Sequence, residues 1–422
     1  DRNKLARFKQ VEARLNDIYK DQGNIGILLH LQSFAESNEQ SNRASTIALL
    51  HILKYLSLNA NKIDTVHKPV LLTATSMGGK FAHDLLPNMQ NSKWFSTLQA
   101  AISGLLKVAA KEMPDYLYKA IDFDLSEIEA NRQFDAQKFE EITLSFIKEI
   151  VANDNIIEVG YRSNERWGME IADGTLKVDF STSPLDQNSV VLITGGARGI
   201  TAEIAVQLAQ HYKPTMVLVG RSALPTGSED PRYAGIKGMR EIKAKVIETL
   251  KEEGKTVNIP EVEARYQNLI KEREIRENMQ RLEKDAKKIE YHSLDVRDAN
   301  AFKLLVAQIY ADHGKIDAVI HGAGIIEDAL LKDKDKESFA RVFDTKVNSA
   351  LTLLEVLKLD TLQHLFFFSS VVGRTGNAGQ SDYVAANEVL NKLALTAKEQ
   401  MPNGRAAAIM WGPGKAVWRI LN

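Results

Sequence analysis

The sequence predicts an α/β protein built as two tandem halves, each with a parallel β-sheet. Short apolar segments rich in β-branched residues alternate with segments whose apolar residues recur at helical spacing, which is typical of parallel sheets covered by helices. The polar stretch 184–189 interrupts this alternation, which then begins again. A chain of 422 residues is long enough for two or three domains, and we expect one domain over 1–183 and another over 184–422.

The first half is expected to begin with an amphipathic helix over residues 1–21. An apolar run at 25–31 has the pattern of a buried strand. A helical segment follows at 45–56 and a strand at 70–74, after which two more helical segments lead to residues 118–122. This order of elements predicts βαβ units and therefore a parallel sheet.

The second half repeats the alternation with one clear helix and five strands. The helix is expected at 199–211. The strands are expected at 190–194, 215–219, 289–294, 316–321 and 364–369.

A long, highly charged stretch at about 222–276 interrupts the second half. Its basic and acidic residues alternate around only a thin seam of apolar residues, which is typical of a solvated helix. We interpret the stretch as a helical insertion that packs lightly on the domain. A coiled-coil site for a partner protein is the alternative.

The overall composition excludes several classes of function. The 54 basic and 55 acidic residues leave a net charge of -1, so the chain lacks the basic excess that nucleic-acid binding requires. The sequence contains no cysteine, which excludes a disulfide framework, a cysteine-ligated zinc and a cysteine nucleophile. The nine histidines show no metal-ligand spacing, so no metal site is predicted.

The hydropathy and the N-terminal sequence indicate where in the cell the protein is expected. No apolar stretch is long enough for a membrane span, and the charged N-terminus does not resemble a signal peptide, so a cytoplasmic location is expected. The chain starts at Asp1 rather than at methionine, which indicates a piece of a longer protein or a processed form.

A glycine-rich turn joins the strand at 190–194 to the helix at 199–211. Glycines let the backbone approach a pyrophosphate, and the helix N-terminus supplies free N–H groups and the positive end of a dipole. A tight turn without a ligand is the alternative, but strand, glycine turn and helix in this order form the context of a dinucleotide site. The residues assigned to cofactor binding in this turn are Thr194, Gly195, Gly196, Arg198, Gly199 and Ile200.

The next strand ends in Gly220, Arg221 and Ser222, and this end indicates which cofactor is bound. NAD-specific domains place an acid here for the ribose hydroxyls, whereas a guanidinium can pair with a 2′-phosphate. Arg221 therefore favours NADPH, and Arg198 adds positive charge to the same region. Each arginine alone is also compatible with an ordinary surface residue.

The Gly-x-x-x-Gly spacing of the turn resembles that of the short-chain dehydrogenases/reductases. Two later strand ends match cofactor contacts of that family in the same order. Asp295 and Val296 resemble the segment whose acid meets the adenine. The small residues Gly322, Ala323 and Gly324 resemble the segment against which the cofactor lies.

A candidate reducing centre follows the strand at 364–369. Ser370 is placed at the carboxyl edge of the sheet, where open α/β sheets bind ligands. Tyr383 and Asn387 are four residues apart in a helical pattern, so they face one side, and a phenol and a hydroxyl can converge on one carbonyl. Ordinary short-chain reductases carry Tyr-x-x-x-Lys here, so Tyr-x-x-x-Asn alone would indicate a disabled enzyme. Lys346, twenty-four residues before Ser370, can supply the ammonium from another element.

The exchange of lysine and asparagine resembles the ketoreductase domains of modular polyketide synthases and polyunsaturated-fatty-acid synthases. The resemblance implies that a hydride from NADPH reduces a β-keto carbonyl, which Ser370 holds and Tyr383 protonates. It also implies that Lys346 lowers the pKa of the phenol and holds the nicotinamide ribose, and that Asn387 positions Lys346 or a water.

The resemblance reaches beyond the reducing centre to residues 368–383, 410–413 and 98–122. These ketoreductases carry an N-terminal structural subdomain, a truncated Rossmann copy that binds no cofactor, and residues 72–79 look like its degenerate glycine loop. The implied fold is therefore two tandem Rossmann-like subdomains, the second a doubly wound parallel sheet that binds NADPH.

The substrates of that family are acyl groups held as thioesters on the phosphopantetheine arm of an acyl carrier protein, beside other domains of a multienzyme synthase. Asp328, Gln380 and Trp411 match positions for substrate and stereochemistry. Ile326-Glu327-Asp328 keeps only the last aspartate of the family's Leu-Asp-Asp signature, and Thr375 stands where a tryptophan can occur. These features favour B-type reduction to the D-hydroxyl. Only residues 414–422 follow Trp-Gly-Pro, so the family's substrate lid is expected to be truncated or absent from this sequence.

Two rival functions remain open at this point. A free-standing short-chain dehydrogenase for a soluble alcohol or ketone explains the glycine turn, but it explains neither the first half nor the moved lysine. A catalytically silent structural domain of a synthase is the second rival. The complete set of Lys346, Ser370, Tyr383 and Asn387 argues against it.

Overall fold

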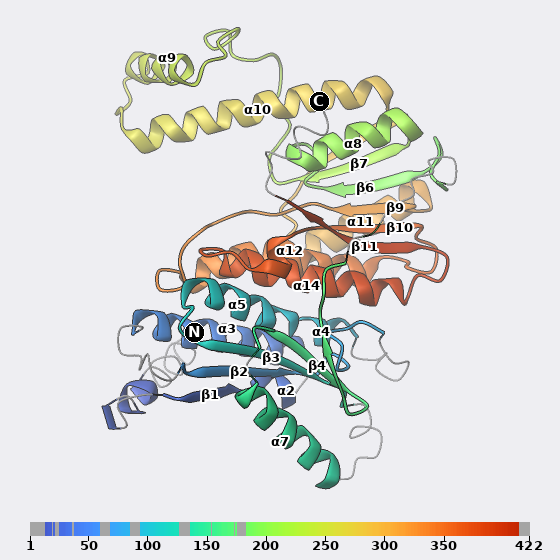
Figure 1. The fold of residues 1–422 in the computed structure, drawn as a ribbon. Helices are drawn as coiled ribbons and strands as arrows, with labels where there is room; N and C mark the ends of the chain where they lie inside the picture. Colours follow the sequence, from blue (N-terminus) through green and yellow to red (C-terminus); the bar gives the residue numbers. More distant parts are fainter. Residues whose placement is uncertain are drawn as a thin grey trace. The chain divides into compact units, whose positions relative to one another are not determined.

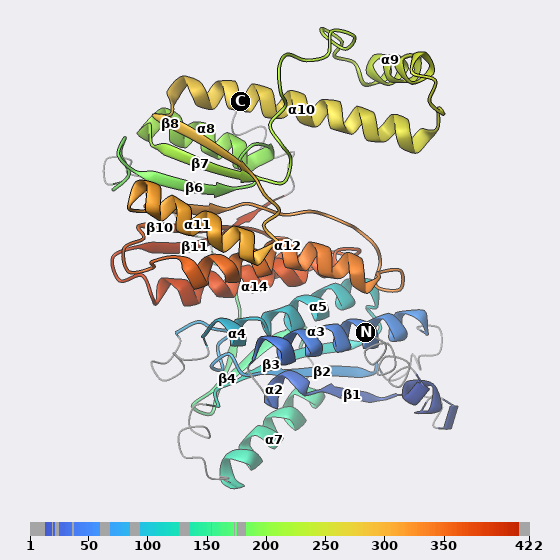
Figure 2. The same cartoon turned by 180° about the vertical axis from the view of Figure 1, so that it is seen from behind.

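The computed structural model describes residues 13–412 apart from 19, 22–24, 36–37, 60–67, 85–92, 126–135, 153, 173 and 175–182. The chain forms two compact units (Figures 1 and 2). Unit 1 consists of Asp1–Phe180 with Gly324–Asn422, and unit 2 consists of Ser181–Ala323. The expected domain boundary between residues 183 and 184 stays a prediction. No helix in the described ranges is both long and apolar enough to cross a membrane.

The N-terminal half, within unit 1, is built on a five-stranded sheet of order β1-β2-β3-β4-β5. The first four strands are parallel, and β5 pairs antiparallel with β4. Helices α3 and α5 cover one face of this sheet, and α7 covers the other (Figure 1). The elements are β1 (Ile27–His30), α2 (Gln32–Ala35), α3 (Glu39–Leu58), β2 (Val70–Thr75), α4 (Lys93–Thr97), α5 (Ala100–Glu112), β3 (Leu117–Phe123), α7 (Ala136–Val151), β4 (Glu158–Arg162) and β5 (Glu165–Gly168).

The expectation of a buried strand at 25–31 is wrong in one respect. Strand β1 forms there, but it lies at the edge of the sheet, where Ile27 and Leu29 are 49% and 48% exposed. A continuous apolar run does not distinguish a central strand from an edge strand, because that depends on which strands arrive beside it. Of the helix expected at 1–21, residues 13–18 and 20–21 are helical, and residues 1–12 lie outside the described part.

Unit 2 contains the strand and the helix that flank the glycine turn. Its four strands are parallel in the order β9-β6-β7-β8, so β6 has a neighbour on each side. The predicted strands and the predicted helix of this region are confirmed to within two residues at each end. The elements are β6 (Val190–Thr194), α8 (Gly199–Tyr212), β7 (Thr215–Gly220), β8 (Lys288–Ser293), α11 (Ala299–His313) and β9 (Ala318–His321).

The charged insertion is helical, as predicted, and forms α9 (Met239–Glu252) and α10 (Ile259–Asp285). The side chain of Asn258 caps α10 by accepting the N–H of Glu261 at 2.8 Å. Helix α10 continues past residue 276, the expected end of the insertion, and packs against α8. The insertion also buries a small core of its own, made of Tyr233, Ile242, Val246, Leu250 and Val262.

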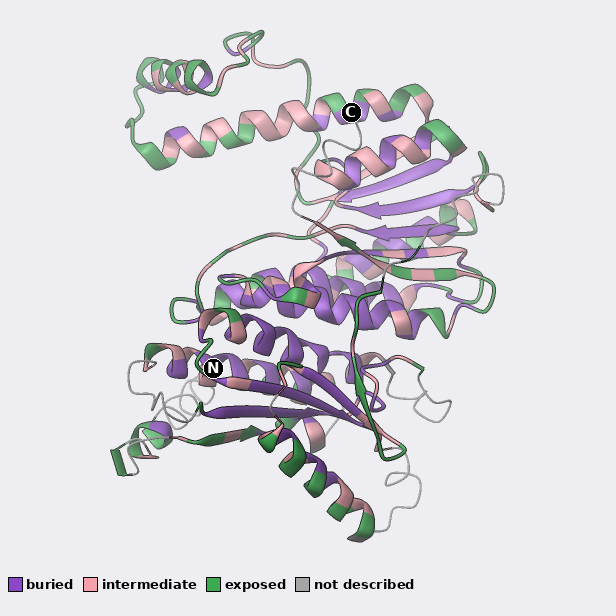
Figure 3. Ribbon diagram, in the orientation of Figure 1, coloured by how far each residue is buried: buried purple, intermediate pink, exposed green. Residues whose placement is uncertain are grey.

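The C-terminal elements of unit 1 hold the predicted reducing centre. Strands β10 (His364–Ser370) and β11 (Arg405–Trp411) are parallel neighbours, and α14 (Ser381–Lys398) packs against both. Helix α14 also packs against α5 of the N-terminal half, and Figure 3 shows both helices as mostly buried. The parallel strands and flanking helices confirm the predicted α/β fold class. The other elements here are α12 (Lys336–Val356) and α13 (Val372–Thr375).

The contact between α5 and α14 is close because of a glycine. A Cβ atom at Gly104 would lie 2.8 Å from the Cα atom of Ala385. Ala385 lies between Tyr383 and Asn387 in the sequence of α14. The backbone of α5 therefore supports the turn of α14 that carries the two predicted catalytic residues.

The turn after β2, expected to be a degenerate glycine loop, is closed by a carboxylate of the chain itself. Asp122, near the end of β3, is fully buried and accepts the Thr75 hydroxyl at 2.7 Å. It also accepts the backbone N–H groups of Met77 and Phe81 at 2.6 and 2.8 Å. Gly79, with φ +72°, lies so close to β4 that an added Cβ would be 2.2 Å from the carbonyl oxygen of Tyr161. Asp122 thus occupies two backbone donors of this turn.

Asp122 gives a prediction for the pH dependence of stability. Burial raises the pKa of Asp122 to about 6, against hydrogen bonds that lower it, from a usual value of 3.8. Because the folded-state pKa is the higher one, the stabilisation linked to protonation is present below pH 4 and is lost as the pH rises through 6. Relative to Asp122→Asn, the wild-type free energy of unfolding should rise by about 2 kcal/mol as the pH falls from 7 to 4.

Chemical denaturation of both proteins at several pH values measures this difference. The Asn variant keeps the size of the side chain and removes the titration, so other titrating groups cancel in the comparison. A difference that stays constant over this range would contradict the prediction.

Candidate active site

The four predicted catalytic residues come from three elements of unit 1. Lys346 lies on α12, Ser370 ends β10, and Tyr383 and Asn387 lie one turn apart near the start of α14. Gly376 and Gly379 take positive φ angles of 70° and 80°, which lets the chain turn between β10 and α14. The structure brings Lys346 beside Tyr383, with Nζ 5.2 Å from the centroid of the phenol ring.

Lys346 is a buried ammonium held by a backbone carbonyl. Its Nζ donates to the carbonyl oxygen of Phe368 at 2.9 Å. Burial lowers the pKa of Lys346 to about 8, because the charged form loses its hydration. Gly324, predicted as a cofactor residue, leaves room for this side chain, since an added Cβ would lie 3.0 Å from Lys346 Cε.

The pKa of the Tyr383 phenol is shifted in the direction opposite to the one expected from the sequence. Burial raises the pKa of Tyr383, while hydrogen bonding with Asn387 and Ser370 lowers it and the charge of Asp328 raises it. The expected lowering by Lys346 is not among these causes. In this structure Tyr383 is therefore a weaker acid than a free tyrosine.

Asn387 is fully buried and only partly satisfied. Its Nδ2 donates to the backbone carbonyl oxygen of Tyr383 at 2.7 Å. Its Oδ1 is buried and has no hydrogen-bond partner among the described residues. A buried acceptor without a partner is costly, so this oxygen fits a donor from water or ligand. The expected contact between Asn387 and Lys346 is not among the hydrogen bonds of the described residues.

Ser370 and Trp411 lie side by side at the ends of β10 and β11. The Ser370 hydroxyl donates to the carbonyl oxygen of Trp411 at 3.3 Å. The Trp411 ring packs edge-on against Phe368 at 5.3 Å between centroids. Its Nε1 is buried without a hydrogen-bond partner in the described part of the chain. Pro413 and the segment 414–422, on which the expectation about the lid rests, lie outside that part.

Asp328 and Gln380, both predicted for substrate and stereochemistry, are bonded to each other. Gln380 Nε2 donates to the two carboxylate oxygens of Asp328 at 3.2 and 3.1 Å. The loops that carry them are also joined by a β-bridge between Ala329 and Gln380. Asp328 is exposed, and its charge raises the pKa of Tyr383.

The predicted cofactor turn in unit 2 has the close packing that its glycines suggest. Gly195 has φ +76°, and an added Cβ would lie 3.0 Å from the carbonyl oxygen of Gly322. The Thr194 hydroxyl bonds His321 Nδ1 at 2.7 Å and accepts the N–H of Ala323 at 3.2 Å. Threonine at the end of β6 thus holds the turn at the end of β9, which places the two predicted cofactor segments together.

The N-terminus of α8 already holds an anion from the protein. Glu274 of α10 accepts the N–H of Gly199 at 2.7 Å and the Arg198 Nε at 2.8 Å. Free N–H groups at a helix N-terminus are also the donors that bind phosphate. The carboxylate shows that this turn accepts an anion, and Arg198, 48% exposed in its side chain, remains open to solvent. The N–H of Ile200 lies in the first turn of the same helix.

The predicted end of the cofactor site lies after β7 and β8. A Cβ on Gly220 would lie 2.5 Å from the Tyr291 hydroxyl, which donates to the carbonyl oxygen of Ser222 at 2.5 Å. Asp295 is bonded by Arg297, which lowers its pKa, and the charge of Arg221 adds to this lowering. Arg221 is exposed, and Val296 is buried. Arg221 and Asp295 are thus close enough to interact.

Sequence reasoning missed three residues that hold these sites. Glu274 lies in the charged insertion, where nothing in the sequence separates it from its neighbours. Lys107 donates to the carbonyl oxygen of Gly373 at 2.9 Å, and Glu112 accepts the N–H groups of Leu331 and Gly379 at 2.7 and 2.8 Å. Both lie on α5, in the half that carries no predicted catalytic residue, so only the folded chain reveals them.

Comparison with known proteins agrees with the geometry. The KR domain family matches residues 189–416. A polyunsaturated fatty acid synthase polypeptide of Thraustochytrium sp. (strain ATCC 26185 / S-3) is 28% identical over 264 residues, which are 61% of this chain and 9% of that protein. Polyketide synthase PksN of Bacillus subtilis (strain 168) is 24% identical over 296 residues, which are 70% of this chain and 4% of that protein. The chain thus spans a small part of these relatives.

Solved ketoreductases share the fold. A structure of A-type ketoreductases from a modular polyketide synthase matches with a TM-score of 0.68 and 20% identity, over 98% of this chain and 74% of that one. A ketoreductase domain from the bacillaene assembly line gives 0.62 and 21%, over 92% and 80%. The predicted tandem Rossmann-like fold is confirmed. The family match covers more than half of the residues of this chain. The chain therefore belongs to the KR domain family, which includes the ketoreductases of polyketide and polyunsaturated-fatty-acid synthases.

Proposed function

We propose that this domain uses NADPH to reduce a β-ketoacyl thioester on an acyl carrier protein to the β-hydroxyacyl thioester, within a polyketide or polyunsaturated-fatty-acid synthase. The observation that carries the proposal is the pairing of Lys346 with Tyr383 across two helices. This pairing supplies the ammonium that Asn387 replaces in the usual Tyr-x-x-x-Lys arrangement. The substrate class follows from the synthases to which the chain is similar.

The residues of unit 2 fit NADPH. The N–H of Gly199, at the N-terminus of α8, donates to the Glu274 carboxylate. When the cofactor binds, its pyrophosphate would replace this carboxylate at the glycine turn. The exposed guanidinium of Arg221, with Arg198, would pair with the 2′-phosphate. When bound, NADPH supplies a hydride from C4 of its nicotinamide ring. The other residues assigned to the cofactor are Thr194, Gly195, Gly196, Gly199, Ile200, Gly220, Ser222, Asp295, Val296, Gly322, Ala323 and Gly324.

In this proposal Tyr383 is the acid. The hydroxyls of Ser370 and Tyr383 donate hydrogen bonds to the carbonyl oxygen, which becomes an alkoxide as its carbon is reduced. Burial raises the pKa of Tyr383, so the phenol still carries its proton at neutral pH and can transfer it to the alkoxide. Lys346, with a pKa of about 8, is mostly protonated at pH 7, and its ammonium lies 5.2 Å from the centroid of the phenol ring.

Asn387 is proposed to hold the water from which Tyr383 regains its proton. Its Oδ1 is a buried acceptor without a partner in the described residues, and a water bound there would lie beside the turn that carries Tyr383. Such a water can relay a proton from solvent to the phenolate after each cycle. The shared turn of α14 ties this acceptor to the acid.

The mechanism predicts that Tyr383→Phe lowers the turnover of a β-ketoacyl pantetheine thioester by about 10²- to 10⁴-fold, because the proton donor is lost. The fold should persist, since only one oxygen is removed. NADPH oxidation, followed by absorbance, measures the rate, and thermal unfolding measures the fold. Tyr266→Phe, on the insertion, is the matched control and should leave turnover unchanged. Undiminished turnover of Tyr383→Phe would refute the assignment.

The cofactor assignment predicts that Arg221→Asp reverses or removes the preference for NADPH over NADH. Losing charge-assisted bonds to the 2′-phosphate should lower kcat/KM for NADPH by about 10- to 100-fold. The negative charge should at the same time favour the ribose hydroxyls of NADH. The ratio of the two kcat/KM values is the measurement, with Arg240→Asp on α9 as the control. An unchanged ratio for Arg221→Asp would contradict the phosphate contact.

The bond between Asp328 and Gln380 gives a prediction for the product. We expect the D-hydroxyl from B-type reduction, and we expect Asp328→Ala to reduce the stereochemical purity, because Gln380 then loses its acceptor. Chiral chromatography of the β-hydroxyacyl product measures both. Lys332→Ala, an exposed residue of the same loop, is the control. A pure L-hydroxyl product from the wild-type chain would overturn the B-type assignment.

A further inference from the structure

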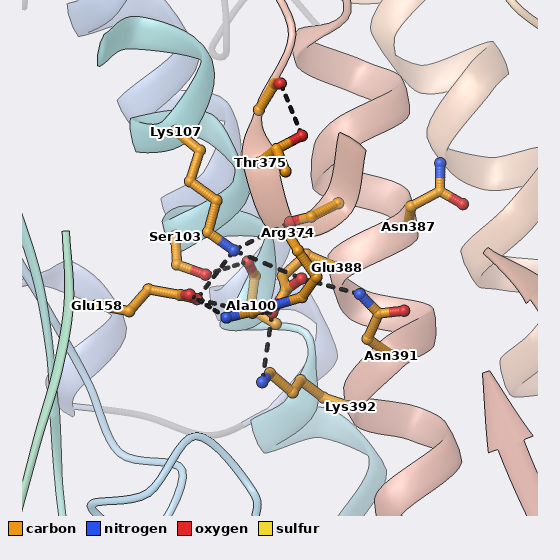
Figure 4. Close-up of polar contacts among 12 residues, drawn as sticks. Ala100, Ser103, Lys107, Glu158, Arg374, Thr375, Asn387, Glu388, Asn391 and Lys392 are labelled. Carbon is orange, nitrogen blue, oxygen red and sulfur yellow. Dashed lines mark hydrogen bonds and ion pairs between the residues drawn. The ribbon is translucent and has the colours of Figure 1, made fainter. Parts of the chain in front are cut away.

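Five charged side chains meet in a buried cluster behind the reducing centre, all within unit 1. They come from both halves of the chain (Figure 4). Glu158 and Glu388 are 5% and 0% exposed, and Lys107 and Lys392 are 4% and 1% exposed. We call this group the charge cluster; its members are Lys107 of α5, Glu158 of β4, Arg374 of α13, and Glu388 and Lys392 of α14.

Each carboxylate of the charge cluster is shared among cations. Lys107 Nζ lies 3.0 Å from Glu158 Oε1 and 3.5 Å from Glu388 Oε2. Arg374 bridges the same two carboxylates, at 2.6 Å to Glu158 and 2.5 Å to Glu388. Lys392 adds a contact of 3.3 Å to Glu388. Although burial opposes it, Lys107 and the other cations lower the pKa of both glutamates, so both stay ionised.

The charge cluster contacts the backbone that leads into the reducing centre. Lys107 donates to the carbonyl oxygen of Gly373, three residues after Ser370. Glu388 directly follows Asn387, and it accepts the amide of Asn391 one turn on at 2.9 Å. Asn387 itself points away from the cluster (Figure 4). One ammonium from the N-terminal half thus holds both the segment after the serine and the helix of the tyrosine.

The packing around Lys107 leaves little freedom for these elements. A Cβ on Gly373 would lie 3.2 Å from Asn387 Cβ, and a Cβ on Gly376 would lie 2.5 Å from the carbonyl oxygen of Lys107. Together with the contact of Gly104 on Ala385, these distances put α5, α13 and α14 in backbone contact. Backbone contacts set how closely the helices approach, and the charges set their rotation and register.

Stability alone does not account for such an arrangement. Removing charges from water costs several kcal/mol per ion, and well-packed apolar residues in place of buried ion pairs are often as stable or more so. What ion pairs provide and apolar contacts do not is direction, because each bond is made at one geometry only. A catalytic centre assembled from three elements requires such directional restraint.

We propose that Lys107 is a positioning residue for the reduction: with Glu158 it fixes α13 and α14 so that the hydroxyls of Ser370 and Tyr383 converge on one carbonyl. This inference rests on the proposed function. It assigns to the N-terminal half a role in the chemical step, exerted through the charge cluster. All but one of the residues assigned to cofactor binding lie in unit 2, so the affinity for the cofactor should not depend on the charge cluster.

The test compares Lys107→Met with Lys111→Met, an exposed lysine one turn further along α5. In Lys107→Met we expect the single-turnover reduction of a β-ketoacyl pantetheine thioester to slow by about 10- to 100-fold, as misplacement of reacting groups does. The Kd of NADPH should change less than about twofold, an amount below 0.5 kcal/mol. Lys107→Arg, which can bond the same carbonyl and carboxylates, should restore most of the rate.

Amide hydrogen exchange in residues 371–388 tests the inference apart from activity. Lys107→Met should speed exchange there, and Lys111→Met should not. If Lys107→Met turns over as Lys111→Met does, or loses NADPH affinity in step with rate, the positioning role is overturned. If the wild-type chain reduces no thioester, the proposed function fails, and unchanged exchange in Lys107→Met would then overturn the positioning role as well. If Lys107→Met does not fold, Glu158→Gln, which keeps the size of the side chain, decides by the same measurements.

Discussion

The contact between α5 and α14 is the constraint on which the reducing centre depends. Tyr383 and Asn387 lie on α14, and the turn between them rests on Gly104 of α5 at a distance that only a glycine permits. A larger residue at position 104 would push the two helices apart. The N-terminal half therefore supports the helix that carries Tyr383 and Asn387. A change in the packing of α5 would also move these two residues.

Each half has a turn that follows a parallel strand and binds a carboxylate of the chain, but the two carboxylates are held differently. In the first, Asp122 is fully buried in the turn after β2 and comes from the neighbouring strand, so it cannot leave without unfolding the sheet. In the second, Glu274 engages the turn after β6 from the insertion, and its side chain is 31% exposed. A partly exposed carboxylate on a separate helix can be exchanged for a phosphate at modest cost, because water compensates it when it leaves. One motif is thus structural and the other remains available to a ligand.

Much of this protein follows from the sequence, because the decisive signals are local. The strands of unit 2, the glycine turn and the spacing from Ser370 to Asn387 depend on neighbouring residues, and the structure places these elements within two residues of the predicted positions. The exposure of β1 and the role of Lys107 depend on partners far away in the chain. Lys107 and Gly373 are 266 residues apart, and no periodicity of either segment records the other. The pKa of Tyr383 was missed for the same reason, since burial is a property of the folded chain.

Because the lysine stands on α12 and not four residues after Tyr383 on α14, the two helices must be held rigidly relative to each other. A lysine one turn after the tyrosine would be positioned by the helix alone. Here Lys346 reaches Tyr383 from another helix, anchored on the Phe368 carbonyl, so three elements must keep their relative positions for the pair to form. Each element is held on its far side by the N-terminal half or by the sheet: Lys107 bonds α13 and α14, and Arg43 of α3 bonds Asp344 of α12 at 3.0 Å. In the proposed mechanism, the exchange of lysine and asparagine is compatible with catalysis because contacts from the first half hold the helices that the exchange has made interdependent.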